Sequence, residues 1–209
     1  MSDTIVVVDA GTGNLRSVVG ALNKIGASVR LTSAAEDVLE AERIVLPGVG
    51  AFGEFMEGLR RNQLDNALKV FIQSGRPLLG ICVGMQALME MSEELGQFDG
   101  LGIFHGRVVR FPSATAYKVP HTGWNQVWIR QDNPLTTGLT SGFYAYFNHS
   151  FYCQPQQSEV VLATTDYMVD FCSIIGRGVL FGVQFHPEKS QTAGEMILKN
   201  FMNISGRQA

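Results

Sequence analysis

The sequence has few cysteines, no long apolar run and no cluster of basic residues, and each absence excludes a class of protein. Its three cysteines are an odd number without metal-ligand spacing, which is typical of a reducing compartment. No apolar run approaches the ~20 residues that a membrane-spanning helix needs. The formal net charge is only −3 and the lysines and arginines are scattered, so the composition indicates neither a nucleic-acid partner nor a membrane.

The N-terminus has no recognisable export signal. Residues 1–4 lead straight into a predicted strand and lack the basic and then apolar layout of a signal peptide. Together with the low cysteine count, this predicts a cytoplasmic protein. The 209 residues are 45% hydrophobic, enough for one full core, and no linker, repeat or low-complexity segment divides them. We therefore expect a single domain over residues 1–209.

Short apolar strands alternate with helices through the first half of the chain. Strands are predicted at 4–9, 28–31, 43–46 and 77–81, and helices at 15–25, 33–40, 52–74 with a break near Asn62, and 83–91. Shorter strand-like pieces follow at 106–110, 125–129, 143–147, 160–165, 171–176 and 179–183, before a last helix at 193–204. The pattern predicts an α/β fold: an open, mixed, mostly parallel central sheet flanked by helices, with antiparallel strands in the second half.

Cys82 is the first candidate for chemistry. It stands in Gly80-Ile81-Cys82-Val83-Gly84, between an apolar strand and the predicted helix at 83–91. The flanking glycines leave room for a strained strand-to-helix turn that projects the side chain above the sheet, and the helix N-terminus favours a thiolate. Cys153 and Cys172 lack such flanks, and we expect them to be structural.

His186 and Glu188 are the candidates for a proton shuttle. His186 follows the predicted strand and precedes Pro187, which fixes the turn, so that Glu188 can reach and orient the imidazole. A cysteine nucleophile needs a base that is held in this way. His105, His121 and His149 have no comparable setting and are expected to be structural.

Two glycine-rich segments suggest different roles. Pro47-Gly48-Val49-Gly50 ends a strand at the sheet edge expected for Cys82, where glycine amides can turn toward an oxyanion. Gly11-Thr12-Gly13 lacks the third glycine of a dinucleotide-binding loop, and Asp9 precedes it where an acidic residue should follow ~20 residues later. We therefore expect an oxyanion hole in the first segment and no nucleotide cofactor in the second.

Together these residues resemble the class I (triad) glutamine amidotransferases. In that family Gly-x-Cys-x-Gly-x-Gln carries the nucleophile and His-Pro-Glu completes the triad, matching residues 80–86 and 186–188 here. Segments 47–52, 120–125, 146–151 and 184–190 are similar to the glutaminase subunits of imidazole glycerol phosphate synthases. This resemblance runs from Asp9 to the last helix, and the expected fold is accordingly that of the class I amidotransferases, which is flavodoxin-like.

The resemblance implies a mechanism. Cys82 attacks the side-chain amide of L-glutamine, and His186, oriented by Glu188, protonates the leaving ammonia; water then releases glutamate from the thioester. The implied oxyanion hole is formed by Gly48, Val49, Gly50 and Val83. The implied glutamine-binding positions are Gly50, Gln86, Ser150 and Phe151. No metal or organic cofactor is implied.

The resemblance also implies a heterodimer. Ammonia would pass to a (β/α)8-barrel cyclase subunit that makes imidazole glycerol phosphate and aminoimidazole-carboxamide ribonucleotide in histidine biosynthesis. Its nucleotide ligand would activate the glutaminase through a peptide flip in residues 48–50. Interface candidates are Lys189, Tyr146, Tyr144 and residues 120–124 including Trp124, although the residues alone would equally suit Trp124 and Trp128 as core aromatics.

Asn148 and Thr122 depart from the residues usual in this subunit. Three alternatives stay open on the sequence. The chain could serve a paralogous synthase, such as one that aminates a surface sugar. It could be a non-catalytic regulatory partner of a synthase, or a free-standing Cys–His hydrolase acting on γ-glutamyl compounds or small peptides.

Overall fold

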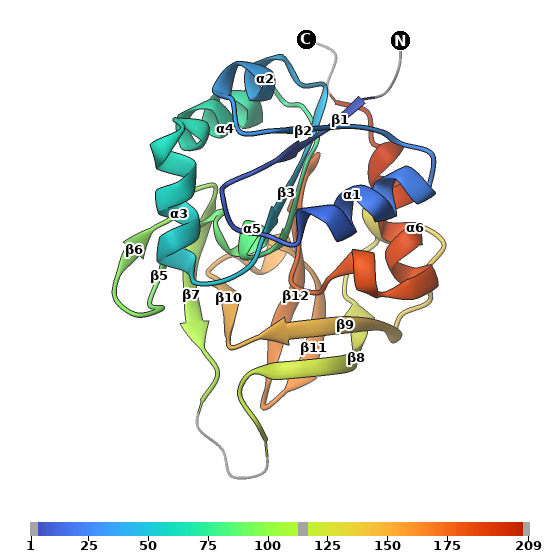
Figure 1. Ribbon diagram of the computed structural model, residues 1–209. Coiled ribbons are helices and arrows are strands. Elements are labelled where there is room, and N and C mark those ends of the chain that lie inside the picture. The colour runs from blue at the N-terminus through green and yellow to red at the C-terminus, as the bar shows by residue number, and fades with distance from the viewer. Residues whose placement is uncertain (1–3, 113–116, 207–209) are drawn as a thin grey trace.

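A nine-stranded sheet organises the computed structural model, which describes residues 4–112 and 117–206. The strand order is β2-β1-β3-β4-β13-β12-β11-β8-β9. Figure 1 shows β1, β2 and β3 in the upper part of the molecule and β8, β9 and β11 in the lower part. Neighbours are parallel from β2 to β13 and antiparallel from β13 to β9. In sheet order, the strands are Ser28–Thr32, Thr4–Val8, Arg43–Gly48, Leu78–Cys82, Leu180–Val183, Val169–Arg177, Val161–Tyr167, His121–Ile129 and Phe143–His149. The predicted α/β class with a mixed sheet is confirmed.

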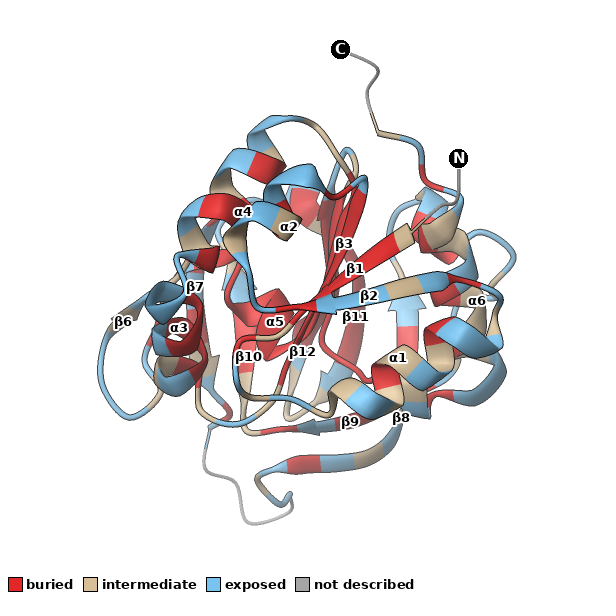
Figure 2. Cartoon of the chain, turned by 45° about the horizontal axis from the view of Figure 1, so that its top comes forward, coloured by how far each residue is buried: buried red, intermediate tan, exposed pale blue. Residues whose placement is uncertain are grey.

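Helices cover both faces of the parallel strands. Helices α2, α3 and α4 lie on one side and α1 and α6 on the other (Figure 2). Their bounds are Leu15–Lys24 (α1), Ala35–Glu40 (α2), Phe52–Arg61 (α3), Leu64–Gln73 (α4) and Gln191–Met202 (α6). Short 3-10 turns occupy Pro134–Thr136, Ser158–Val160 and Pro187–Lys189. Among the described helices, none has the length and apolar character to cross a membrane.

This double cover explains why the central strands are continuous apolar runs rather than alternating ones. Every residue of β3 and β4 is buried. The predicted break near Asn62 is confirmed, because α3 ends at Arg61 and Gln63, with a positive φ of 56°, turns the chain into α4.

A second, four-stranded sheet with the order β10-β7-β5-β6 lies beside the first and was not predicted. Its strands are Phe151–Pro155, Phe104–Arg110, Met89–Ser92 and Phe98–Asp99. The prediction of a helix over 83–91 is therefore wrong. Helix α5 is only Val83–Gln86, because the carbonyls of Ala87 and Leu88 accept from the backbone of Leu101 and Ile103, at 2.8 and 2.9 Å, instead of continuing the helix.

Three neighbouring strands end together and define the edge where chemistry is expected. Gly48 of β3 is paired with Cys82 of β4, and Ile81 of β4 is paired with Val183 of β13. The segments that follow these strands therefore leave the sheet side by side. Residues 48–50, Cys82 and His186 are brought to one edge in this way.

Candidate active site

Cys82 occupies a strained turn between β4 and α5. Its φ of 55° and ψ of −112° are rare for a residue with a side chain. Glycine is required two residues after Cys82, because a Cβ on Gly84 would lie 1.8 Å from the Leu46 carbonyl oxygen. A Cβ on Gly80 would lie 2.6 Å from the Gly84 carbonyl oxygen. Close packing of α5 on β3 thus explains Gly84, and close packing of α5 on β4 explains Gly80.

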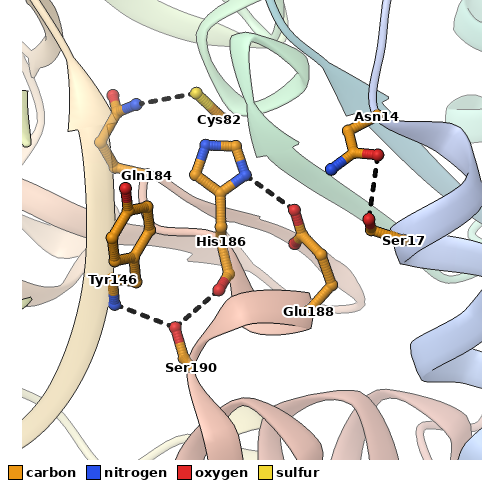
Figure 3. Close-up of polar contacts among 8 residues, drawn as sticks. All are labelled: Asn14, Ser17, Cys82, Tyr146, Gln184, His186, Glu188 and Ser190. Atoms are coloured by element: carbon orange, nitrogen blue, oxygen red, sulfur yellow. Dashed lines mark hydrogen bonds and ion pairs between the residues drawn. The ribbon is translucent and has the colours of Figure 1, made fainter. Parts of the chain in front are cut away.

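His186 and Glu188 form a buried pair next to this cysteine. His186 Nδ1 lies 2.9 Å from Glu188 Oε1, and the two side chains are 4% and 1% exposed. The other edge of the imidazole faces the Cys82 sulfur (Figure 3). Burial disfavours the imidazolium, but the contacts with the Cys82 sulfur and the Glu188 carboxylate outweigh it and raise the pKa of His186 to about 10. The pair is therefore arranged to hold a proton beside the sulfur.

The backbone around His186 is held in place by β9. Its N–H donates to the Tyr146 carbonyl at 2.9 Å. The Ser190 hydroxyl donates to the His186 carbonyl at 2.6 Å and accepts from the Tyr146 N–H at 3.0 Å (Figure 3). The imidazole is thus positioned from both the 3-10 turn that follows it and the antiparallel half of the sheet.

Cys82 opens into a cavity of about 130 Å³. The residues that line it are Val49, Gly50, Cys82, Val83, Gln86, Glu94, Asn148, His149, Ser150, Phe151, His186 and Lys189. All four positions expected for glutamine are among them. Of the oxyanion-hole candidates, Val49, Gly50 and Val83 line the cavity and Gly48 does not. A Cβ on Gly48 would meet the Phe55 ring at 2.7 Å, whereas Gly50 has a positive φ of 88° with open space around it.

Two further residues of this site had no assigned role in the sequence. Glu94, from the turn between β5 and β6, lines the cavity and accepts from the Phe52 N–H at 2.7 Å. Nothing in its local sequence marks it, because its position depends on the unpredicted second sheet. Gln184, fully buried, directs its amide nitrogen at the Cys82 sulfur at 3.7 Å (Figure 3). Only its place in the Gln-Phe-His-Pro-Glu motif could have marked it.

Four of the interface candidates, Trp124, Tyr144, Tyr146 and Lys189, lie on an aromatic face beside the cavity, whereas His121 in the candidate segment 120–124 is buried. Trp124 is 46% and Tyr144 57% exposed, and the Trp124 ring lies 6.1 Å from that of Tyr146. Lys189 Nζ stands 5.5 Å from the Tyr146 ring centre and also lines the cavity. Trp128, 41% exposed, lies on the same strand as Trp124, so neither tryptophan is a core residue.

The two departures noted in the sequence contact one another. Thr122 and Asn148 are paired across β8 and β9, and the Thr122 hydroxyl donates to Asn148 Oδ1 at 3.0 Å. Asn148 also lines the cavity. The two residues therefore form one polar contact at its rim.

The remaining cysteines are unsuited to nucleophilic chemistry. Cys153 and Cys172 are buried, and burial raises the pKa of both thiols, that of Cys153 strongly. Across residues 4–112 and 117–206, no group of three or more His, Cys, Asp or Glu side chains could hold a metal ion.

Known proteins are similar to this chain in sequence over most of its length. A family model described as "Glutamine amidotransferase class-I" matches residues 6–204. The chain is 47% identical to the "Imidazole glycerol phosphate synthase subunit HisH" of Syntrophotalea carbinolica, over 94% of this chain and 98% of that protein. It is 44% identical to the protein of the same name from Geobacillus kaustophilus, over 96% and 97%.

Solved structures share the fold at low sequence identity. The "Structure of PurLQS from Thermotoga maritima" superposes with a TM-score of 0.77 at 18% identity, over 97% of this chain and 99% of that one. A crystal structure of a glutamine amidotransferase superposes with a TM-score of 0.75 at 20% identity, over 95% of this chain and 97% of that one. At these identities the likeness concerns the fold alone.

Proposed function

The chain belongs to the class I glutamine amidotransferases, and we propose that it is the glutaminase subunit of an imidazole glycerol phosphate synthase in histidine biosynthesis. It hydrolyses L-glutamine to glutamate and ammonia and delivers the ammonia to a (β/α)8-barrel cyclase subunit. Residues 1–209 act as one amidotransferase domain in the cytoplasm. The observation that carries the proposal is that Cys82 and His186 line one cavity, with the buried Glu188 bonded to the far side of the His186 ring.

The reaction needs only side chains and backbone amides of this chain. The Cys82 sulfur attacks the glutamine side-chain carbon, and the resulting oxyanion is stabilised by amides at residues 48–50 and at Val83. His186, protonated beside the sulfur, gives its proton to the departing nitrogen, which leaves as ammonia. The neutral imidazole then takes a proton from water, hydroxide attacks the thioester, and glutamate leaves as the thiolate and imidazolium are restored.

Acceptors in the cavity suit the α-ammonium group of glutamine. Gln86 Nε2 donates to the Phe151 carbonyl at 3.0 Å and to Gln184 Oε1 at 3.1 Å, so only the carbonyl oxygen of this amide is left for a ligand. The Glu94 carboxylate lies in the same cavity. These two acceptors recognise a cationic amine, and the Ser150 hydroxyl and the Lys189 ammonium are available for the α-carboxylate.

The aromatic face of Trp124, Tyr144 and Tyr146, with Lys189, is the docking site for the cyclase. Half-exposed aromatics next to a catalytic cavity are what a protein interface uses as anchors. Docking here closes the open side of the cavity and lets ammonia leave without entering bulk water. Binding of the nucleotide ligand to the cyclase reorients the peptide at Gly50, whose open surroundings permit it.

The test is glutamate release from L-glutamine by the chain alone, with the cyclase subunit, and with the cyclase and its nucleotide ligand. We expect low activity alone and a large rise with both additions, abolished by Cys82→Ser. Strong activity of the isolated chain would instead favour a free-standing hydrolase. Activation only by the subunit of a different synthase would identify the chain as the glutaminase of a paralogous synthase. No activity with any partner would indicate that the chain is a non-catalytic regulatory module.

A further inference from the structure

We propose that the side-chain amide of Gln184 is a fixed, uncharged hydrogen-bond donor to the Cys82 sulfur, which holds that sulfur as a thiolate opposite the proton on His186. The inference rests on Cys82 being the nucleophile of the proposed function and assigns a role to a residue outside the triad. Its basis is a chain of hydrogen bonds whose direction can be worked out atom by atom.

The direction is set by a main-chain carbonyl. The Phe151 carbonyl oxygen can only accept, so the Gln86 atom that lies 3.0 Å from it is the amide nitrogen. The same nitrogen lies 3.1 Å from the Gln184 side chain, which must therefore present its carbonyl oxygen. The remaining end of the Gln184 amide, its NH2 group, then faces Cys82, with Nε2 3.7 Å from Sγ. The donor role of Gln184 toward the sulfur thus follows from backbone geometry.

Gln184 is well placed to do this throughout the reaction. Gln184 is fully buried. Its main-chain N–H donates to the Ser173 carbonyl at 2.9 Å, and this bond anchors the residue to β12. His186 gives its proton away and takes it back in each turnover, whereas the amide donor keeps its protons. A donor of this kind favours the thiolate both before attack on glutamine and when the thioester releases the sulfur. The sequence predicted that the N-terminus of a helix over residues 83–91 would stabilise the thiolate. Helix α5 has only four residues, and the Gln184 amide takes over that role.

Alkylation of Cys82 tests this without any need for glutamine. The rate of reaction with iodoacetamide as a function of pH reports the thiolate fraction, and mass spectrometry locates the adduct. We expect Gln184→Met, which removes the donor, and Gln184→Asn, which withdraws it, to move the midpoint of this profile upward by about one pH unit, a tenfold change. Other titratable groups near Cys82 are Glu94, His149, His186 and Lys189 at the cavity, Glu188 behind His186, and the buried Cys153 thiol. None of these residues is substituted in the variants.

Ser173→Ala is the matched control. Ser173 is buried next to Gln184, and its hydroxyl has no hydrogen-bond partner among the residues that the structure describes. This variant disturbs the same packing without touching the sulfur, and its profile should equal that of the native chain. A thermal melt followed by circular dichroism checks that each variant is folded. If Gln184→Met does not fold, the comparison is made with Gln184→Asn.

Two results would overturn the inference. One is an unchanged alkylation profile in a folded Gln184 variant, even if glutaminase activity falls through loss of the Gln86 contact and a higher KM. The other is an equal shift in Ser173→Ala, which would make the effect one of general packing. If the native chain with its cyclase fails to hydrolyse glutamine, the proposed function fails, but the alkylation profiles still decide the role of Gln184.

Discussion

Glu188 is bonded through one of its two carboxylate oxygens. Oε1 meets the His186 ring at 2.9 Å, while Oε2 is buried without a hydrogen-bond partner within the described part of the chain. A buried carboxylate with one unsatisfied oxygen is costly unless a positive charge compensates it. The raised pKa of His186 keeps its ring protonated, and this imidazolium supplies the positive charge that compensates the Glu188 carboxylate.

We predict that Glu188→Gln lowers kcat of the partner-activated glutaminase by about 100- to 10,000-fold, because the imidazolium loses its counter-charge and its orientation. KM for glutamine should change little, since Glu188 does not line the cavity. Steady-state kinetics measure both constants. Glu93→Gln is the control, because Glu93 is an exposed carboxylate paired with Arg107, and it should behave as the native chain. A higher KM with an unchanged kcat in Glu188→Gln would contradict this role of Glu188.

His121 and His149 form a buried hydrogen-bonded pair that the mechanism does not use. His149 Nδ1 lies 2.8 Å from the Phe151 carbonyl and must donate, so His149 Nε2 accepts from His121 Nδ1 at 3.1 Å. The Asn125 amide nitrogen lies 3.3 Å from His121 Nε2, which therefore accepts, so the hydrogen bonds of the pair are all made only when both rings are neutral. Burial lowers the pKa of His121 to about 4, and burial, together with the nearby His121 and His186 and against the Phe151 hydrogen bond, lowers the pKa of His149 to about 3.

The pair should make the fold acid-sensitive. Both folded pKa values lie below the ordinary histidine value of 6.5, so the unfolded chain binds more protons as pH falls. The stability they contribute is fully present above about pH 6.5 and is lost as pH falls toward 4 and 3. Denaturant unfolding at a series of pH values should show a steeper fall for the native chain than for His121→Gln, by up to about 1.4 kcal/mol per pH unit. Parallel slopes would show that the pair is not neutral in the folded chain.

At the scale of elements, the turn at the end of β4 and the segment after β3 need glycine for opposite reasons. At Gly84 the constraint is space, since a Cβ would overlap the Leu46 carbonyl oxygen. At Gly50 the space is open and the constraint is the positive φ of 88°. Substitution should therefore damage the fold at the first position and the chemistry at the second.

We predict that Gly84→Ala costs about 3 kcal/mol of unfolding free energy or more, because the clash is with backbone that cannot move aside. Gly50→Ala should remain folded, at a cost of about 1 to 2 kcal/mol, but lose most of its stimulation by the cyclase and nucleotide. Gly20→Ala in α1, where the space is open and φ is not positive, is the control and should be neutral or stabilising. Unchanged stimulation in Gly50→Ala would rule out the peptide flip.

At the scale of the whole molecule, the cavity and the aromatic face share Lys189, so docking of a partner and access to Cys82 are physically linked. We predict that Trp124→Ala weakens binding of the cyclase by about 2 kcal/mol, or about 30-fold, without changing the thermal stability of the isolated chain. Isothermal titration calorimetry measures the affinity. Leu39→Ala, an exposed apolar residue on α2, is the control. Equal affinities for the native chain and Trp124→Ala would move the docking site elsewhere.

Features that depend on neighbouring residues could be predicted from the sequence. The α/β class follows from strand and helix periodicity. The setting of Cys82 follows from its flanking glycines, since a Cβ at Gly80 would overlap the α5 backbone and a Cβ at Gly84 would overlap β3. The contact of His186 with Glu188 likewise needs only Pro187 between them. Local chemistry was sufficient in each case.

Features that depend on backbone far away in the sequence could not be predicted and emerge only in the folded chain. The early end of α5, the second sheet and the position of Glu94 all follow from pairing of residues 87–92 with 98–108. The orientation of Gln184 follows from the carbonyl of Phe151, and the exposure of Trp124 from its place next to the edge strand β9. Long-range hydrogen bonds override helical spacing because a buried backbone group must find a partner, wherever in the chain that partner lies.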